Sequence, residues 1–183
     1  MATHLMRKPP VVIVPYDSDW PRRFAAEARL IRGQIDPYLE GVEHIGSTAV
    51  PGLASKPIID IMPGLKALQD AQACIEPLSR IGYEYVPEYE EELPQRRYFR
   101  KGPETGRTHH LHMVETSSDF WRRHLLFRDY VRTHPTTARE YEALKIRLAR
   151  EHGSDREGYT EGKTSFVEDV VARARRDAGL PSR

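Results

Sequence analysis

Apolar side chains in the first part of the chain recur with two different spacings. Residues 11–14 form a continuous apolar run that Pro15 ends, and this predicts a short β-type segment. A helix is predicted to begin within residues 17–21, where a capping residue, acids and a proline stand together. Gly33 weakens this helix and Pro37 ends it. Its core face repeats at helical spacing and comprises Phe24, Ala28, Ile31 and Ile35.

The middle of the chain alternates strand and turn signals. A strand is predicted to end at Gly46-Ser47, and a loop rich in proline and glycine leads to a second strand at residues 58–62. Residues 66–81 have a helical pattern that Gly82 stops. Further strands are predicted at 83–86, 96–100 and 110–115, with a hairpin turn at 101–107.

After Ser118 the pattern predicts helices alone. They cover residues 120–131, a segment that opens with capping-box spacing at Thr137 and stops at Gly153, and residues 156–178. We therefore expect an α+β fold, a mixed β-sheet flanked by helices with a C-terminal three-helix segment. The expected organisation is a single domain, 1–183, with an α/β core at 11–116 and a helical extension at 117–180 packed on it.

Composition narrows the class of protein. Of 183 residues, 39% are apolar and 30% charged, and the net charge of +1 gives no support for dedicated nucleic-acid binding. Cys74 is the one cysteine, which excludes an intramolecular disulfide and a multi-cysteine zinc site. Residues 1–10 do not resemble a signal peptide, and no apolar run approaches the roughly 20 residues that cross a bilayer. We expect a cytoplasmic protein without a membrane partner.

Asp60 stands among apolar residues of the second predicted strand. Strand alternation places Ile58, Asp60 and Met62 on one face. A carboxylate among apolar neighbours is costly to bury unless it binds a cation or a hydrogen-bond donor. Asp60 is therefore the first candidate for a catalytic residue and for a metal ligand.

The turn before the loop has the composition of a phosphate site. Glycine permits close approach of the backbone, a serine hydroxyl donates hydrogen bonds, and free N–H groups after a strand can form an anion-binding nest. The candidates here are Gly46, Ser47 and Thr48.

Histidines and cations supply the remaining candidates. His110 and His112 share one face of the last strand, so they suit a metal if Asp60 lies on the neighbouring strand. When protonated, the two histidines would instead bind phosphate without a metal. The cations proposed to neutralise phosphate are Lys56, Arg97 and Lys163. The alternative for each cation is a solvated surface charge.

Several common catalytic signatures are absent from the sequence. It contains no Gly-x-x-x-x-Gly-Lys-Ser/Thr loop and no Gly-x-Gly-x-x-Gly, so neither a P-loop nor a dinucleotide site is indicated. No Gly-x-Ser-x-Gly elbow and no His-Glu-x-x-His motif occur either.

Two stretches carry a family resemblance. Residues 43–54 read EHIGSTAVPGLA and residues 56–61 read KPIIDI, and together they resemble the signature of GrpB family proteins. The resemblance runs from about Val11 to Val171, including residues 19–21, 109–112, 126–130, 141–145 and 159–163. GrpB proteins are bacterial proteins of nucleotidyltransferase-like fold, also found fused to dephospho-CoA kinases. The resemblance implies that fold for this chain.

In the wider polymerase-β-like superfamily, Gly-Ser is followed by an acid-x-acid pair that holds two Mg²⁺ ions for in-line nucleotidyl transfer. Gly46 and Ser47 match this pattern, and the acid pair falls on Ile58 and Asp60, so that the second acid alone is present. The superfamily's third acid falls near His110 or His112. One aspartate with two histidines suits Zn²⁺, Mn²⁺ or Fe²⁺ better than Mg²⁺.

These observations lead to one functional hypothesis and two alternatives. We expect a protein that binds a nucleotide or related phosphorylated small molecule, with a divalent metal (Mg, Mn or Zn) and nucleotidyl transfer as its reaction. The first alternative is a non-catalytic nucleotide- or metal-binding regulatory module. The second is an accessory partner of coenzyme A synthesis, which the family's fusions suggest.

Overall fold

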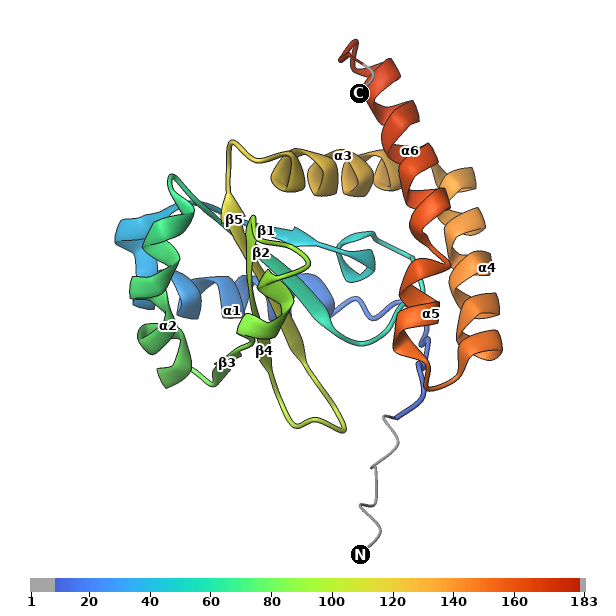
Figure 1. Cartoon of the computed structure of the whole chain (residues 1–183). Coiled ribbons are helices and arrows are strands. Elements are labelled where there is room, and N and C mark those ends of the chain that lie inside the picture. The colour runs from blue at the N-terminus through green and yellow to red at the C-terminus, as the bar shows by residue number, and fades with distance from the viewer. Residues whose placement is uncertain (1–8, 182–183) are drawn as a thin grey trace, which may run out of the picture.

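A mixed five-stranded sheet forms the centre of the molecule (Figure 1). The computed structural model describes residues 9–181. The strands are β1 (Leu39–Ile45), β2 (Ile59–Leu65), β3 (Tyr83–Tyr85), β4 (Arg96–Lys101) and β5 (His109–Glu115), in the order β1-β2-β5-β4-β3. Strands β2 and β5 are parallel, and the other neighbours are antiparallel. With helices flanking this sheet, the predicted α+β class is confirmed.

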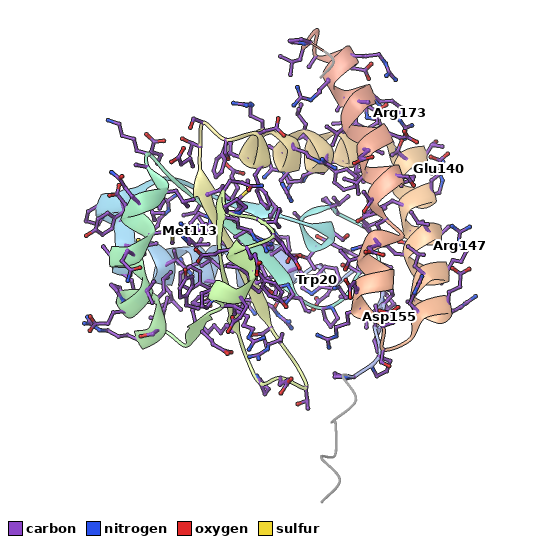
Figure 2. All side chains as sticks on the ribbon, viewed as in Figure 1. Trp20, Met113, Glu140, Arg147, Asp155 and Arg173 are labelled. Carbon is purple, nitrogen blue, oxygen red and sulfur yellow. The ribbon has the colours of Figure 1, made fainter. Side chains whose placement is uncertain are left out.

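One face of the sheet is covered by α1 (Trp20–Ile35) and α2 (Ala71–Arg80). The main core lies here, because alternate strand residues such as Ile61 and Leu111 point toward these two helices and are fully buried. Cys74 of α2 belongs to the same core. Figure 2 places Trp20 and Met113 inside this layer, whereas Glu140, Arg147 and Arg173 lie on the outer helices.

The other face carries a smaller apolar layer. Here α3 (Asp119–Thr133) contributes side chains, including Phe120 and Trp121, that pack on Ile45, Met62 and Val114 of three strands. The contact buries only part of this face. The polar side chains of β2 and β5 gather at the border of this apolar cluster, where Asp60 pairs in register with Ile45 and the His112 ring stacks on Phe120.

The C-terminal helices are α4 (Pro135–His152), α5 (Arg156–Glu161) and α6 (Thr164–Asp177), and they stand together at one end of the sheet (Figure 1). Val50 and Leu53, from the loop between β1 and β2, are buried against Val131, Tyr141 and Val170 of α3, α4 and α6. Helix packing therefore sets the shape of the loop that begins with Gly46. The division into a core and a helical extension stays a prediction.

Four expectations about local structure were wrong, of which three concern where an element forms or begins. Residues 11–14 make a single bridge, Val14 to Ser55, because the run meets only the loop and no full strand. The helix expected at 66–81 begins at Ala71, after a 3-10 turn at Leu68–Asp70. Thr137 does not cap α4, which begins two residues earlier at Pro135, where a missing N–H does no harm.

The helix expected at 156–178 is divided into α5 and α6 around Gly162 and Lys163. A Cβ at Gly162 would lie 2.6 Å from Cδ2 of Leu148, so a larger residue here would displace the Leu148 side chain of α4. The break places Lys163 at the start of α6, facing the loop.

No helix within residues 9–181 has the length and apolar character that crossing a bilayer requires. The expectation that the N-terminus is not a signal peptide falls largely on residues 1–8, outside the described residues.

Candidate functional site

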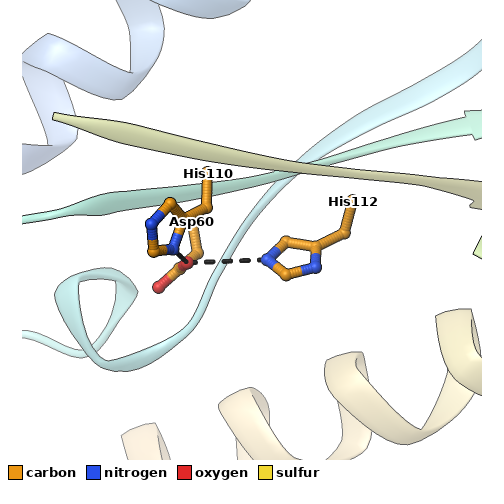
Figure 3. A group of neighbouring side chains, drawn as sticks. All are labelled: Asp60, His110 and His112. Atoms are coloured by element: carbon orange, nitrogen blue, oxygen red, sulfur yellow. Dashed lines mark ion pairs between the residues drawn. The ribbon is translucent and has the colours of Figure 1, made fainter. Parts of the chain in front are cut away.

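Asp60, His110 and His112 come together on the face of the sheet that α3 partly covers, here called the open face (Figure 3). The parallel register pairs Asp60 of β2 with His110 of β5, and His112 follows two residues along the same face. Oδ1 of Asp60 lies 3.3 Å from Nδ1 of His110 and 3.6 Å from Nε2 of His112. All three ligand atoms lie within 4.8 Å of one another. We call these residues the Asp60 cluster.

The two histidines keep Asp60 ionised. Burial alone raises the pKa of this carboxyl group, but hydrogen bonds and charge from His110 and His112 outweigh burial and lower it well below its usual range. Burial lowers the pKa of His112. The side chain of Asp60 is 27% exposed, so it is accessible to a ligand. The cluster is therefore an anionic oxygen flanked by imidazoles.

Gly46 makes room for the Asp60 carboxylate. Its φ of +70° is a conformation that L side chains rarely adopt, and a Cβ here would lie 2.4 Å from Oδ2 of Asp60. Glycine at the end of β1 is thus required both by the turn and by the close contact with Asp60. The structure links the two features that the sequence placed 14 residues apart.

Arg96 contacts the cluster from β4. Its Nη1 lies 3.3 Å from Nδ1 of His112, and its Nε is buried without a hydrogen-bond partner among the described residues. A guanidinium has donors only, so Nδ1 of His112 accepts this hydrogen bond. Tyr98 lies beside both histidines, with ring centroids 5.6 Å from His110 and 5.3 Å from His112.

Two lysines approach the cluster from the loop and from α6. Nζ of Lys56 lies 5.3 Å from the centroid of the Tyr159 ring, and Nζ of Lys163 lies 4.6 Å from the same centroid. Neither ammonium makes an ion pair with an acid in the described part of the chain. Burial lowers the pKa of Lys56, and burial together with the charge of Lys56 lowers the pKa of Lys163 to about 8. The Asp60 charge opposes both shifts.

Lys145 of α4 has a structural role. It is 2% exposed, donates a hydrogen bond to the carbonyl oxygen of Ala54, and lies 4.9 Å from the Tyr141 ring centroid. Burial lowers the pKa of Lys145 to about 7, although the Glu142 charge opposes this. Glu142 accepts a hydrogen bond from the backbone N–H of Ala54 at 2.7 Å. The pair holds the loop against α4.

The remaining predicted site residues are Ser47 and Thr48, in the loop between β1 and β2, and Arg97 of β4. Ser47 acts on the phenol of Tyr141 in α4 and lowers its pKa, which opposes the effect of burial. Thr48 is buried and already bonded, with Oγ1 3.0 Å from Nε2 of His44 and 3.3 Å from the carbonyl oxygen of Ile58. The hydrogen bonds of the Thr48 hydroxyl therefore stabilise the loop between β1 and β2.

Arg97 is not brought together with the other predicted residues. It pairs across the sheet with Met113, which faces the α1–α2 core, and its Nε lies 3.3 Å from Oε2 of Glu90. Its neighbour Arg96 occupies the open face instead. The signal was present in the sequence, because Phe99 is the core residue of this strand and alternation then places 96 and 98 opposite it.

The donor set fits a divalent transition metal. Ligand atoms that share one ion at about 2.1 Å lie about 3 to 3.5 Å apart, close to the separations within the Asp60 cluster. Two imidazoles and one carboxylate favour Mn²⁺, Fe²⁺ or Zn²⁺ over Mg²⁺. Ile58, just before β2, offers no carboxylate for a second ion, and its carbonyl oxygen is bonded to Thr48.

The comparisons with known proteins agree on one family. The family model described as GrpB protein matches residues 10–173. A UPF0157 protein of Pseudomonas aeruginosa is 43% identical over 167 residues, which cover 90% of this chain and 67% of that protein. The crystal structure of conserved protein GrpB from Enterococcus faecalis has a TM-score of 0.82 and 36% identity, covering 91% of this chain and 99% of that one.

A longer relative is a dephospho-CoA kinase of Mycolicibacterium paratuberculosis, 24% identical over 196 residues, which cover 95% of this chain and 48% of that protein. This chain thus spans about half of that kinase. Because the family model matches residues 10–173 and the Pseudomonas aeruginosa protein is 43% identical, the chain belongs to the GrpB protein family.

Proposed function

We propose that this protein binds a nucleotide or related phosphorylated small molecule together with a divalent metal at the Asp60 cluster. The observation that carries the proposal is the meeting of two groups: three ligand atoms within 4.8 Å of one another, and two lysines without acidic partners in the described chain. A metal between the two groups would face both the carboxylate and the phosphate oxygens.

The metal would be held by Oδ1 of Asp60, Nδ1 of His110 and Nε2 of His112. When bound there, it would supply a Lewis acid for a phosphoryl oxygen. Lys56 and Lys163 would bind phosphate oxygens as point charges, and the turn at Gly46 would add backbone N–H groups and the Ser47 hydroxyl. Each lysine gains a counter-ion in this arrangement, which offsets the cost of its burial.

The reaction class that we propose is nucleotidyl transfer, in keeping with the nucleotidyltransferase-like signature of residues 43–61. The oxygen of an acceptor hydroxyl would bond to the α-phosphorus and release its proton to solvent, and the bond from that phosphorus to the leaving pyrophosphate would break. Because Ile58 replaces one acid of the superfamily pair, the reaction would depend on a single ion at Asp60 rather than on two Mg²⁺ ions.

The second candidate function is a non-catalytic module that binds nucleotide and metal and regulates another protein. The Ile58 position favours it, since a two-metal site has one carboxylate too few. An accessory role in coenzyme A synthesis is the third, and the dephospho-CoA kinase relative supports it.

Calorimetric titration of the purified chain with Mn²⁺, and with ATP in the presence of Mn²⁺, tests the proposal. We expect Asp60→Asn to weaken both affinities at least tenfold, because the amide keeps the shape of the side chain but loses its charge. Asp36→Asn removes an exposed acid far from the cluster and serves as the matched control. Equal affinities for Asp60→Asn and the wild type would contradict the proposal.

A measurement of turnover distinguishes nucleotidyl transfer from the non-catalytic regulatory module. Incubation with radiolabelled nucleoside triphosphates and each divalent metal would release pyrophosphate, or label the protein or an added acceptor, if the chain is a transferase. Binding without any such product favours the regulatory module. Co-purification with coenzyme A synthesis enzymes from a bacterial lysate would support the third function.

A further inference from the structure

Tyr89, Tyr98 and Arg96 form a continuous patch beside the candidate metal ligands, here named the aromatic shelf. The ring centroids of Tyr89 and Tyr98 are 5.3 Å apart, at an interplanar angle of 74°. The guanidinium carbon of Arg96 lies 4.9 Å from the Tyr98 centroid and 5.9 Å from the Tyr89 centroid. Because Tyr98 also contacts both histidine rings, the shelf and the Asp60 cluster share one border.

Arg96 differs from Arg97 and Arg100 of β4 in making no ion pair among the described residues, although the charge of Glu92 acts on it at longer range. Arg97 pairs with Glu90 at 3.3 Å, and Arg100 pairs with Glu84 at 2.6 Å. Within residues 9–181, Arg96 makes no ion pair, and its buried Nε has no hydrogen-bond partner. Burial lowers the pKa of this guanidinium. A partly desolvated cation that makes no ion pair is costly, so the Arg96 side chain beside the cluster is suited to bind a ligand that accepts hydrogen bonds.

The shelf offers planar faces in addition to charge. Tyr89, on the 3-10 turn Pro87–Glu90, is 40% exposed, so its ring is accessible to a ligand. Burial raises the pKa of Tyr98, so its phenol stays neutral. Tyrosine rings and a guanidinium plane are the surfaces on which nucleobases stack.

The aromatic shelf lies where it would contact the end of the nucleotide opposite to the phosphates. Lys56 and Lys163 flank the loop between β1 and β2, whereas the shelf is on and beside β4. Strand β5 separates β2 from β4 in the sheet order. Neighbouring strands are about 4.8 Å apart, so the shelf is about 10 Å across the sheet from the Asp60 strand. A nucleoside triphosphate is long enough to reach from one to the other.

We propose that the aromatic shelf stacks the base of a nucleotide whose phosphates contact Lys56 and Lys163. This inference rests on the proposed function and narrows it, because the substrate class becomes nucleotides rather than phosphorylated compounds in general. The Nε–H group of Arg96, which has no hydrogen-bond partner among the described residues, is available to donate to an acceptor atom of the base.

Calorimetry with Mn²⁺ and two probes tests the inference: the non-hydrolysable β,γ-imido analogue of ATP, and inorganic tripolyphosphate. We expect the wild-type chain to bind the analogue at least tenfold more tightly than tripolyphosphate. Tyr89→Leu removes an exposed ring, and it should weaken binding of the analogue about tenfold while leaving tripolyphosphate unchanged. Lys163→Met should weaken both probes.

Tyr38→Leu is the matched control, since Tyr38 is a 36% exposed tyrosine on the 3-10 turn after α1. The inference is overturned if Tyr89→Leu leaves the affinity for the analogue unchanged, or if the two probes bind the wild-type chain equally well; the proposed function survives either result. If neither probe binds, both the proposed function and the inference fail. Thermal unfolding of Tyr89→Leu confirms that the chain is folded.

Discussion

Nη1 of Arg96 lies 3.3 Å from Nδ1 of His112, so the one ring nitrogen that faces away from Asp60 meets a group that only donates hydrogen bonds. In the neutral ring the hydrogen is then on Nε2, where it points toward Asp60. A metal-bound histidine has the opposite requirement, because its second nitrogen usually donates to an acceptor. Arg96 and a metal ion therefore compete for His112.

Removing Arg96 should strengthen metal binding in the absence of nucleotide. We expect Arg96→Met to tighten the affinity for Zn²⁺ or Mn²⁺ about tenfold, because Nδ1 of His112 becomes free to carry the hydrogen while Nε2 binds the metal. Competition with a chromophoric chelator measures the change. Arg97→Met, on the core-facing side of the same strand, is the control and should leave the affinity unaltered. Weaker metal binding by Arg96→Met would show that the competition does not exist.

Gly46→Ala should damage both the turn and the cluster. The positive φ makes any side chain costly by about 1–3 kcal/mol, and the new Cβ would push Oδ2 of Asp60 away from its position. The free energy of unfolding in urea and the Mn²⁺ affinity should both fall. Gly33→Ala in α1, where a Cβ meets nothing within 4 Å, should instead stabilise the protein by about 0.5–1 kcal/mol. Wild-type metal affinity in Gly46→Ala would refute the close contact.

Phosphate affinity should fall as pH rises through about 8. The pKa of Lys163 in the ligand-free protein is lowered to about 8 by burial and by the charge of Lys56, so the ammonium loses its proton above this pH. Bound tripolyphosphate favours the protonated form, and binding at pH 8 should therefore take up protons. Calorimetry in two buffers of different ionisation enthalpy measures this uptake.

Lys163→Arg is the informative variant for this prediction. Arginine stays charged over the whole range, so the fall in affinity above pH 8 should become shallower. If the wild type and Lys163→Arg show the same pH profile, Lys163 does not contact the phosphate.

His44 should make the fold sensitive to acid. It is 6% exposed, stacks on Phe24 at 4.6 Å, and burial lowers its pKa to about 4 from 6.5. The unfolded chain takes up the proton at a higher pH than the folded chain does. Stability is therefore complete above about pH 6.5 and falls by about 3 kcal/mol as pH drops toward 4. Urea unfolding at a series of pH values measures this slope.

His44→Gln does not titrate, so its stability should depend less on pH between 6.5 and 4. The variant is less stable at pH 7, because it loses the stacking on Phe24. Identical slopes in the variant and the wild type would assign the acid sensitivity to other groups, of which His124 is the first, since burial lowers its pKa to about 4 as well.

Local sequence patterns were sufficient to predict the class of fold and to identify the polar residues of β2 and β5. The side-chain period of a strand is two, so alternation alone places His110 and His112 on one face and sets Asp60 apart from Ile59 and Ile61. Glycine, proline and apolar spacing likewise located most helix and strand ends. These signals are local because they depend on residues a few positions apart.

Contacts across long separations needed the fold. The parallel pairing of β2 with β5 brings Asp60 beside His110, and it depends on the topology of the whole sheet. The break at Gly162 brings Lys163 to Tyr159 and Lys56, and it depends on how α5 packs against Leu148 of α4. Sequence spacing predicted the hairpin of β4 and β5 but not the pairing of elements far apart in the chain, because burial of the apolar faces of all the elements together sets their arrangement.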